Sequence, residues 1–415
     1  MRQQHLLNIG ILFLLFPVSS WAKETFELHV NLITLEDISY SKTKAFSQRA
    51  NLFESVNVNR FESLLSTNIN NYDKLDGTLK IQGVEYQFQS DAKPGSNPGP
   101  AVQYKLTLKS ACLPQDKVFI TDQSRNDGLQ QMIGWLQQGS QGLKRACLSE
   151  KSPVDPVAGN PLSLMSTMLE SDFAISSQNS PRNPIQRKTS FRLVPEMGQH
   201  TANGFHYASY TVPASVILPM AQPRNHLVLS MPVTQVDNNG SITTSSSIGA
   251  HLQRRMHDNW QITSGVRVGY VDSDSYQASA SMYSASVNNT FFILLDNINL
   301  SVHQLLSAHR ANKNPFSDYQ TEYQLENQSM KTALRAEGSL NLHIFGSPGS
   351  WDAIVADTRF FGDKLYMEHY QDLALSIGAR RRVGSGDWQA VRGGLTYTQG
   401  QHGFQGYKIN FGYFF

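Results

Sequence analysis

From about residue 189 to residue 415, apolar and polar side chains alternate in long runs. In WQITSGVRVGY, which begins at Trp260, the apolar residues occupy even-numbered positions and mostly polar residues or glycine lie between them. A period of two places alternate side chains on opposite faces of an extended strand. The stretches LRAEGSLNLHI, DLALSIGAR, WQAVRGGLTYT, HLVLSMPV and SIGAHLQRR repeat the pattern. The sequence therefore predicts many long antiparallel strands, each with one apolar and one polar face.

Two all-β architectures can bury such faces. In a soluble sandwich the apolar faces meet inside, whereas in a transmembrane barrel they face lipid and the polar faces line a lumen. Aromatic residues at strand ends, such as Trp260 and Tyr270, are typical of the girdles at membrane interfaces. Charged residues make up only 16 % of the chain, against about 25 % in soluble proteins. We therefore expect an outer-membrane β-barrel over residues 189–415.

The final stretch, YKINFGYFF, carries the same alternation. We expect it to close the barrel, because an open sheet edge in lipid would leave backbone groups without hydrogen bonds. Its apolar odd-numbered face would contact lipid, and Lys408 would lie on the other face. The pattern resembles the signal by which the barrel assembly machinery recognises its substrates, with Asn410 where glycine is usual. The residues expected in this membrane-assembly strand are Tyr407, Lys408, Ile409, Phe411, Tyr413 and Phe415.

The first 22 residues have the layout of a secretory signal peptide. Met1-Arg2 precedes the apolar core LLNIGILFLLF, and Ser20-Trp21-Ala22 provides a small-residue ending. The apolar core is short for a membrane anchor, so we expect cleavage after Ala22 and export to the outer membrane of a Gram-negative bacterium. The formal net charge of +2 gives no reason to expect nucleic-acid binding.

Residues 23–155 read as a small α+β domain, periplasmic or surface-exposed. FELHVNLI, GTLKIQGVEYQF and VQYKLTLKSACL predict three strands, while Lys44–Leu65 and the stretch from Asp127 have mostly helical character. Cys112 and Cys147 are the two cysteines of the chain, and in an exported protein we expect them to form a disulfide. Free thiols or metal ligands are the alternatives.

Residues 156–188 predict a helix followed by a linker. Asn160 is an N-cap candidate before Pro161 at the first helical position. The helix could cap the N-terminal domain through its apolar face. Its candidate residues are Asn160, Leu162, Met165, Leu169 and Phe173.

Residues 155–415 resemble the translocator barrel of autotransporters, in particular the solitary outer-membrane autotransporter-like β-barrels. The resemblance is carried by NPLSLMSTMLESDF, LVLSMPVTQVDNNG, DNWQITSGVRVGYVDSDSYQASASMYSASVNNTF and the final strand. It implies an antiparallel transmembrane barrel of about 12 strands with a helix in its pore, and residues 160–173 are the candidate for this pore helix. The chain departs from ordinary autotransporters because it has no long or repetitive passenger.

Six charged residues fall on predicted lumen faces. They could line a pore with a positive bias that favours anionic solutes, or they could pair with one another inside a filled barrel. The six residues are Arg255, Arg267, Arg335, Glu337, Arg380 and Arg392.

We expect no enzyme activity, no cofactor and no metal site. His303 with Ser301 or Ser307 is the nearest Ser–His pair, and His257, Asp258, Asp272 and Asp274 supply carboxylate–His residue types at strand ends. The Ser–His strand resembles none of the known phospholipase-barrel motifs, and the carboxylate–His residues lie at strand ends, where polar turns are expected. The predicted function is that of a non-enzymatic, monomeric outer-membrane barrel with a pore or surface-display role. The alternatives are a short-passenger autotransporter that displays residues 23–150 as an adhesin, and a barrel lipid hydrolase.

Overall fold

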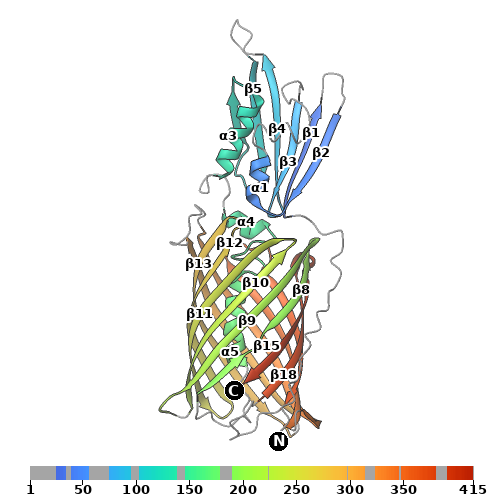
Figure 1. Ribbon diagram of the computed structural model, residues 1–415. Coiled ribbons are helices and arrows are strands. Elements are labelled where there is room, and N and C mark those ends of the chain that lie inside the picture. The colour runs from blue at the N-terminus through green and yellow to red at the C-terminus, as the bar shows by residue number, and fades with distance from the viewer. Residues whose placement is uncertain are drawn as a thin grey trace, which may run out of the picture.

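The computed structural model describes residues 25–33, 39–55, 74–94, 102–137, 145–177, 189–222, 224–296, 298–313, 323–344, 347–379 and 390–414. Two parts are stacked end to end (Figure 1): a twisted sheet with helices stands over one mouth of a long β-barrel, and a helix runs inside the barrel. None of the described helices is long and apolar enough to cross a membrane.

The N-terminal domain is a six-stranded antiparallel sheet with helices packed on one face. Alternate residues of each central strand are buried against these helices, as Leu28, Leu79 and Phe88 show. In sheet order the strands are β2 (Ser39–Phe46), β1 (Phe26–Ile33), β3 (Lys74–Ile81), β4 (Val84–Pro94), β5 (Val102–Ser110) and β6 (Lys117–Thr121), and the helices are α1 (Arg49–Ser55) and α3 (Arg125–Gln137).

A disulfide joins Cys112, just after β5, to Cys147 in α4 (Arg145–Lys151), with 5.5 Å between the two Cα atoms. Helix α4 leads into α5 (Leu164–Ser177). The disulfide thus ties the sheet to the segment that enters the barrel.

Two local predictions in this domain were wrong. GTLKIQGVEYQF is not one strand but parts of β3 and β4, because Gln82 and Gly83 adopt positive φ angles of 54° and 78° and reverse the chain. Lys44–Phe46 belongs to strand β2 and not to a helix. The helix expected from Asp127 is confirmed as α3, and its predicted face, Leu129, Met132, Ile133 and Leu136, is buried.

The second part is a closed antiparallel barrel. Its sheet has 13 labelled strands, but β7 and β8 both pair with β9 and with β19, so they form one interrupted strand and the barrel has twelve. The predicted fold class is therefore confirmed. The strands are β7 (Ser190–Leu193), β8 (Glu196–Ala202), β9 (Phe205–Pro219), β10 (Asn225–Asn238), β11 (Ser241–His257), β12 (Trp260–Ser273), β13 (Ala278–Leu294), β14 (Ile298–Lys313), β15 (Leu325–Ile344), β16 (Ser347–Gly362), β17 (His369–Ala379), β18 (Ala390–Gly400) and β19 (Gln405–Phe414), with a 3-10 turn at Gln401–Gly403.

The barrel is apolar outside and polar inside. On β12, Val266 and Val268 are 61 % and 51 % exposed, while Arg267 between them is 1 % exposed. Buried serine, threonine, asparagine and histidine side chains face the lumen on the neighbouring strands, as Ser247, Asn288 and His303 do. A closed barrel with this polarity satisfies its backbone hydrogen bonds and presents an apolar belt to lipid, as a membrane-spanning barrel must.

Candidate functional site

Helix α5 lies inside the barrel, along the wall formed by β10–β14 (Figure 1). Helix α5 packs closely against the backbone of β12 at Gly269. A Cβ on Gly269 would come within 2.5 Å of the Met168 sulfur and 2.9 Å of a Leu164 methyl group. Glycine is therefore needed at this point for close approach. The structure thus places the predicted pore helix in the lumen and not on the N-terminal domain, and Met165, Leu169 and Phe173 are buried there.

Helix α5 begins at Leu164, three residues after the Pro161 start that an Asn160 N-cap would give. The Asn160 side-chain oxygen instead accepts the Leu162 N–H at 2.9 Å, within a non-helical turn. Asp155 holds the same turn, because its carboxylate accepts the N–H groups of Val157 and Ala158 at 2.9 and 3.0 Å. Pro161 lies within this turn and is not the first residue of the helix.

Residues 152–163, which we call the mouth segment, close the barrel end nearest the N-terminal domain. Barrel groups hold them: Tyr207 Oη donates to the Pro153 carbonyl at 3.2 Å, Tyr323 Oη donates to the Asp155 carboxylate at 3.0 Å, and the Met367 N–H donates to the Gly159 carbonyl at 3.1 Å. Asp155 is fully buried. This end of the lumen is therefore filled by ordered chain.

Two charged clamps fix α5 to the barrel wall. In the first, Asp172 Oδ1 accepts from Arg267 Nε at 2.7 Å and lies 2.8 Å from His251 Nε2. The Arg267 guanidinium also donates to Ser247 and Ser230 at 3.1 and 2.9 Å. All three ionisable groups are buried, so the clamp replaces the hydration that they lose.

The second clamp lies on the opposite side of the helix. Lys331 Nζ donates to Glu170 Oε1 at 2.6 Å and to Asp372 Oδ2 at 2.7 Å, and it lies 4.9 Å from the centre of the Phe173 ring. Tyr370 Oη donates to Glu170 at 2.9 Å. Lys331 is 1 % exposed, so this ammonium group depends on the two carboxylates for its solvation.

Barrel side chains also cap the last turn of α5. Gln253 Nε2 donates to the Ile175 carbonyl at 2.8 Å, and Arg335 Nη1 donates to the Ser177 carbonyl at 2.6 Å. Asn288 additionally bonds the Ser176 hydroxyl. A cation at a helix C-terminus interacts favourably with the helix dipole. The helix is therefore held at both ends and along its length.

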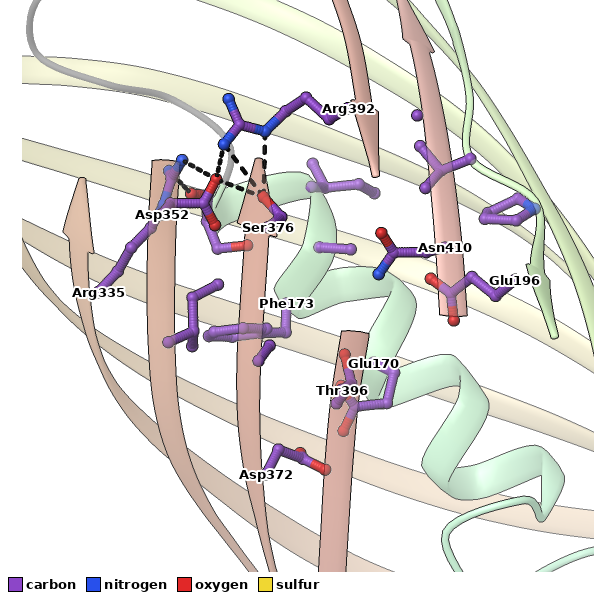
Figure 2. A pocket seen from close by; sticks show the side chains of 18 of the residues that line it. Glu170, Phe173, Glu196, Arg335, Asp352, Asp372, Ser376, Arg392, Thr396 and Asn410 are labelled. Atoms are coloured by element: carbon purple, nitrogen blue, oxygen red, sulfur yellow. Dashed lines mark hydrogen bonds and ion pairs between the residues drawn. The ribbon is translucent and has the colours of Figure 1, made fainter. Parts of the chain in front are cut away.

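Beyond the helix end, Arg335 and Arg392 flank Asp352 (Figure 2). Arg392 Nη2 lies 2.5 Å from Asp352 Oδ2, and Arg335 Nη2 lies 3.6 Å from the same oxygen and 3.1 Å from Glu337. Arg392 also donates to Ser376 at 3.1 Å. Of the predicted lumen charges, Arg335 and Glu337 are thus paired with each other, and Arg392 is paired with Asp352.

A cavity of about 380 Å³ remains between α5 and the wall formed by β15–β19 and β7–β9. The residues of α5 that line it are Thr167, Glu170, Ser171, Phe173, Ala174, Ile175 and Ser177. The charges that line it are balanced, since it has five basic and five acidic residues: Arg192, Lys331, Arg335, Arg392 and Lys408, and Glu170, Glu196, Glu337, Asp352 and Asp372.

The remaining predicted residues are the other lumen charges and those of the final strand. Arg267 belongs to the first clamp, whereas Arg255 lies at the far mouth, 5.5 Å from the Phe292 ring, and donates to the Asp258 carbonyl. Arg380 and Phe415, like the signal peptide, lie outside the described residues. In the final strand Tyr407, Ile409 and Phe411 are 57 %, 41 % and 50 % exposed on the outer face, and Lys408 faces the cavity. Tyr413 pairs in register with Leu193 and closes the barrel.

Sequence reasoning missed these residues of the clamps: Glu170, Asp172, His251, Lys331, Tyr370 and Asp372. The first two interrupt an otherwise apolar helix as Glu-Ser-Asp, a signal that such a helix face meets polar groups. Lys331 has the same parity as Arg335, so extending that strand backwards would have placed it on the lumen face. Asp372 lies on the polar face of a strand that was predicted.

The Ser–His pair considered for catalysis is part of the packing. His303 Nε2 lies 2.9 Å from Ser301 Oγ, its Nδ1 lies 3.1 Å from Thr290 Oγ1, and Phe173 covers the ring edge-on. His303 has no exposed surface, and neither it nor Ser301 lines the cavity. The described residues contain no cluster of His, Cys, Asp or Glu that could hold a metal ion.

The N-terminal domain rests on the barrel turns at the closed mouth. Asn238 Nδ2 donates to Thr25 Oγ1 at 2.8 Å, the Arg49 N–H donates to the Ser275 carbonyl at 2.9 Å, and the Phe26 and Tyr276 rings lie 5.9 Å apart. Burial raises the pKa of Tyr276 to about 12, because the phenolate would lose its hydration in this contact. The domain is therefore docked and not merely tethered.

No protein-family model matches the sequence, and no curated protein sequence matches it either. Solved structures do match the barrel part. The β-domain of the Bordetella autotransporter BrkA is 11 % identical with a TM-score of 0.42, and the match covers 55 % of this chain and 98 % of that one. The translocator domain of autotransporter NalP from Neisseria meningitidis is 11 % identical with a TM-score of 0.41, covering 60 % and 98 %. An outer membrane channel from Pseudomonas putida F1 is also 11 % identical with a TM-score of 0.41, covering 57 % and 99 %.

Proposed function

We propose that this chain is an outer-membrane anchor of the autotransporter translocator type, without enzyme activity, that displays its N-terminal domain on the cell surface. One observation carries the proposal: the polypeptide passes through the barrel. The N-terminal domain sits at one mouth, α5 runs along the lumen, and the first barrel strand begins at the opposite mouth (Figure 1). A barrel built this way holds the N-terminal domain on one side of the membrane, while its first strand begins on the other side.

The final strand suggests which side this is. The pattern that resembles the barrel assembly signal lies in β19, which runs from the closed mouth to the opposite mouth. The assembly machinery would read this strand from the periplasm, so the opposite mouth would face the periplasm and the domain would face outwards. In this proposal the exported chain loses its signal peptide, spans the membrane as a monomer and exposes the domain as an adhesin or surface ligand.

A pore role is the second candidate, favoured by the cavity of about 380 Å³ beside α5. The mouth segment and the balanced charges of the cavity argue for a closed barrel. Deletion of residues 160–173 should then raise the conductance of the protein in planar bilayers above that of the intact chain. Equal conductance of the two proteins would show that this helix is not what closes the pore.

A lipid hydrolase is disfavoured by the position of its candidate residues. Ser301 and His303 face the lumen beneath Phe173, whereas a lipid substrate would approach from the outer wall. The hydrolase alternative predicts an activity on purified lipid that is lost in His303→Ala.

Paired epitope tags at the two mouths test the display proposal. One tag is inserted at His402 in the turn between β18 and β19, at the closed mouth, and a matched tag is inserted at Asn259 in the turn between β11 and β12, at the far mouth. Both turns are exposed. A third tag at Gln115, in the exposed turn between β5 and β6, reports on the domain itself.

Protease treatment of intact cells should remove the tags at His402 and Gln115 and spare the tag at Asn259. Permeabilised cells should lose all three. The reverse pattern in intact cells would place the domain in the periplasm, and the chain would then be a plugged barrel that recruits a periplasmic partner.

A further inference from the structure

Strand β6 is an edge of the N-terminal sheet. It pairs with β5 on one side, and no other described strand pairs with it. Three of its residues, Lys117, Phe119 and Thr121, point towards the helix-covered face, while Val118 and Ile120 point to the open face. A free edge offers backbone N–H and C=O groups to an added strand.

The open face of β6 also exposes large apolar side chains, unlike the rest of the described surface of this domain. Val118 is 39 % and Ile120 is 56 % exposed, and among the described residues before the barrel no other large apolar side chain is exposed. On the other face, Phe119 is only 7 % exposed and packs edge-on against Trp135 of α3. Exposed apolar side chains at alternate positions of an edge strand match the side-chain pockets that an added strand would use.

The other edge of the sheet is different. The described β2 residues from Ser41 to Ala45 include Lys42 and Lys44 and no large apolar side chain. Lysine on an edge strand discourages pairing with another chain. The two edges therefore differ in apolar exposure, since β6 exposes Val118 and Ile120 whereas this part of β2 exposes lysines and small or polar side chains, and β2 provides an internal control for β6.

The charge around β6 indicates what would pair with it. Between Val102 and Thr121 the β5–β6 hairpin carries three lysines and one aspartate, a net charge of 3 − 1 = +2. The aspartate, Asp116, is 3.4 Å from Lys109. Lys117 lies over the Phe119 and Trp135 rings, at 5.9 and 5.5 Å from their centres, at the start of the edge. On β6 itself an added strand would meet Lys117 on the helix-covered face and Val118 and Ile120 on the open face. Lys105 and Lys109 lie on the open face of β5, one strand further from the edge, with Lys105 opposite Ile120 in the register.

We propose that β6 is a docking site for an extended segment of a partner protein, one that alternates acidic and apolar residues and adds to the sheet as a seventh strand. Its apolar side chains would pack on Val118 and Ile120, and its acidic side chains would face Lys117. This site does not depend on which side of the membrane the domain occupies, so it goes beyond the proposed display function.

Hydrogen–deuterium exchange on the full-length protein in detergent micelles tests whether the edge is free. The β6 amides that point away from β5 should exchange fast, and a ten-residue peptide alternating valine and glutamate should slow them. Slow exchange of every β6 amide in the protein alone would overturn the proposal, because the chain would then cover its own edge.

Binding of the fluorescein-labelled peptide, followed by anisotropy, tests the chemistry. Ile120→Lys should weaken binding by about tenfold or more, while the matched change Ala45→Lys on β2 should leave it unchanged. A peptide with N-methyl groups on alternate amides, or one with lysine in place of glutamate, should not bind. No saturable binding by the valine–glutamate peptide, or equal binding by the N-methylated one, would overturn strand addition. A protein dimer that Ile120→Lys dissociates would assign the edge to a second copy and overturn the proposed partner.

Discussion

The N-terminal domain buries its apolar side chains, whereas the barrel buries its polar side chains and exposes the apolar ones. In the domain, Leu79 and Phe88 are buried and the polar residues between them face water. In the barrel, Val268 and Leu375 face outwards and Arg267 and Lys331 are buried. Both regions use the same period-two alternation, so the alternation specifies a two-faced strand and the surrounding solvent decides which face is inside.

The two interiors also depend on different forces. The core of the domain is held by apolar burial, which has no direction and tolerates small adjustments. The lumen is held by paired charges and hydrogen bonds, and each of these groups is costly if its partner is lost. The cost of a substitution inside the barrel should therefore depend on which charged or hydrogen-bonded partner it removes, whereas inside the domain it should depend on how much apolar volume is lost.

The largest effect is expected from Lys331→Met, which leaves Glu170 and Asp372 without their cation. Breaking a buried ion pair on one side costs about 3–5 kcal/mol. The midpoint temperature at which the barrel loses its compact electrophoretic mobility should fall sharply. In the control variant Lys331→Arg, which keeps the positive charge, the midpoint should stay close to that of the unchanged protein. An unchanged midpoint in Lys331→Met would show that solvent, and not Lys331, compensates the two carboxylates.

The matched change in the other interior is Leu79→Ala. It should destabilise the N-terminal domain by about 2–5 kcal/mol, since Leu79 has no exposed surface in the apolar core. Protease resistance of the domain in urea measures this loss. The electrophoretic mobility of the barrel should not change, and a parallel loss of barrel stability would mean that the two regions unfold as one unit.

A charge introduced on the outer wall should lower the stability of the barrel nearly as much as the loss of a charge in the lumen. Leu375→Arg places a guanidinium in the apolar belt, where such a change costs about 2–4 kcal/mol near the membrane midplane. Gln371→Arg, on the same face but near the closed mouth, should cost about 0–1 kcal/mol. Urea titration in lipid vesicles measures both variants. Equal costs would contradict a lipid-facing position for Leu375.

The smallest effect is expected where the two regions meet. The Tyr276 pKa of about 12 lies above its ordinary value of 10.0, so the neutral phenol favours docking. This stabilisation is complete below pH 10 and is lost as the pH rises towards 12. Proteolytic release of the domain should increase over that range, and Tyr276→Phe should reduce the increase. An identical pH profile in the variant would remove Tyr276 from the docking contact.

The sequence by itself determined the local features of this protein. The alternation predicted the strands and their outward faces, as Trp260, Ile262 and Val266 show, because a strand's side-chain period is fixed by its backbone geometry. The two cysteines were paired correctly, because a single pair in an exported chain has one intramolecular partner choice.

Only the tertiary structure decided what fills the barrel. Asp172 meets Arg267 and His251 across 95 and 79 positions of the sequence, and Glu170 meets Tyr370 across 200. No local pattern encodes such distances, because they depend on how the barrel closes and on which wall the helix contacts. The sequence could place charges on a lumen face, but their pairing became definite only when twelve strands and a helix shared one narrow interior.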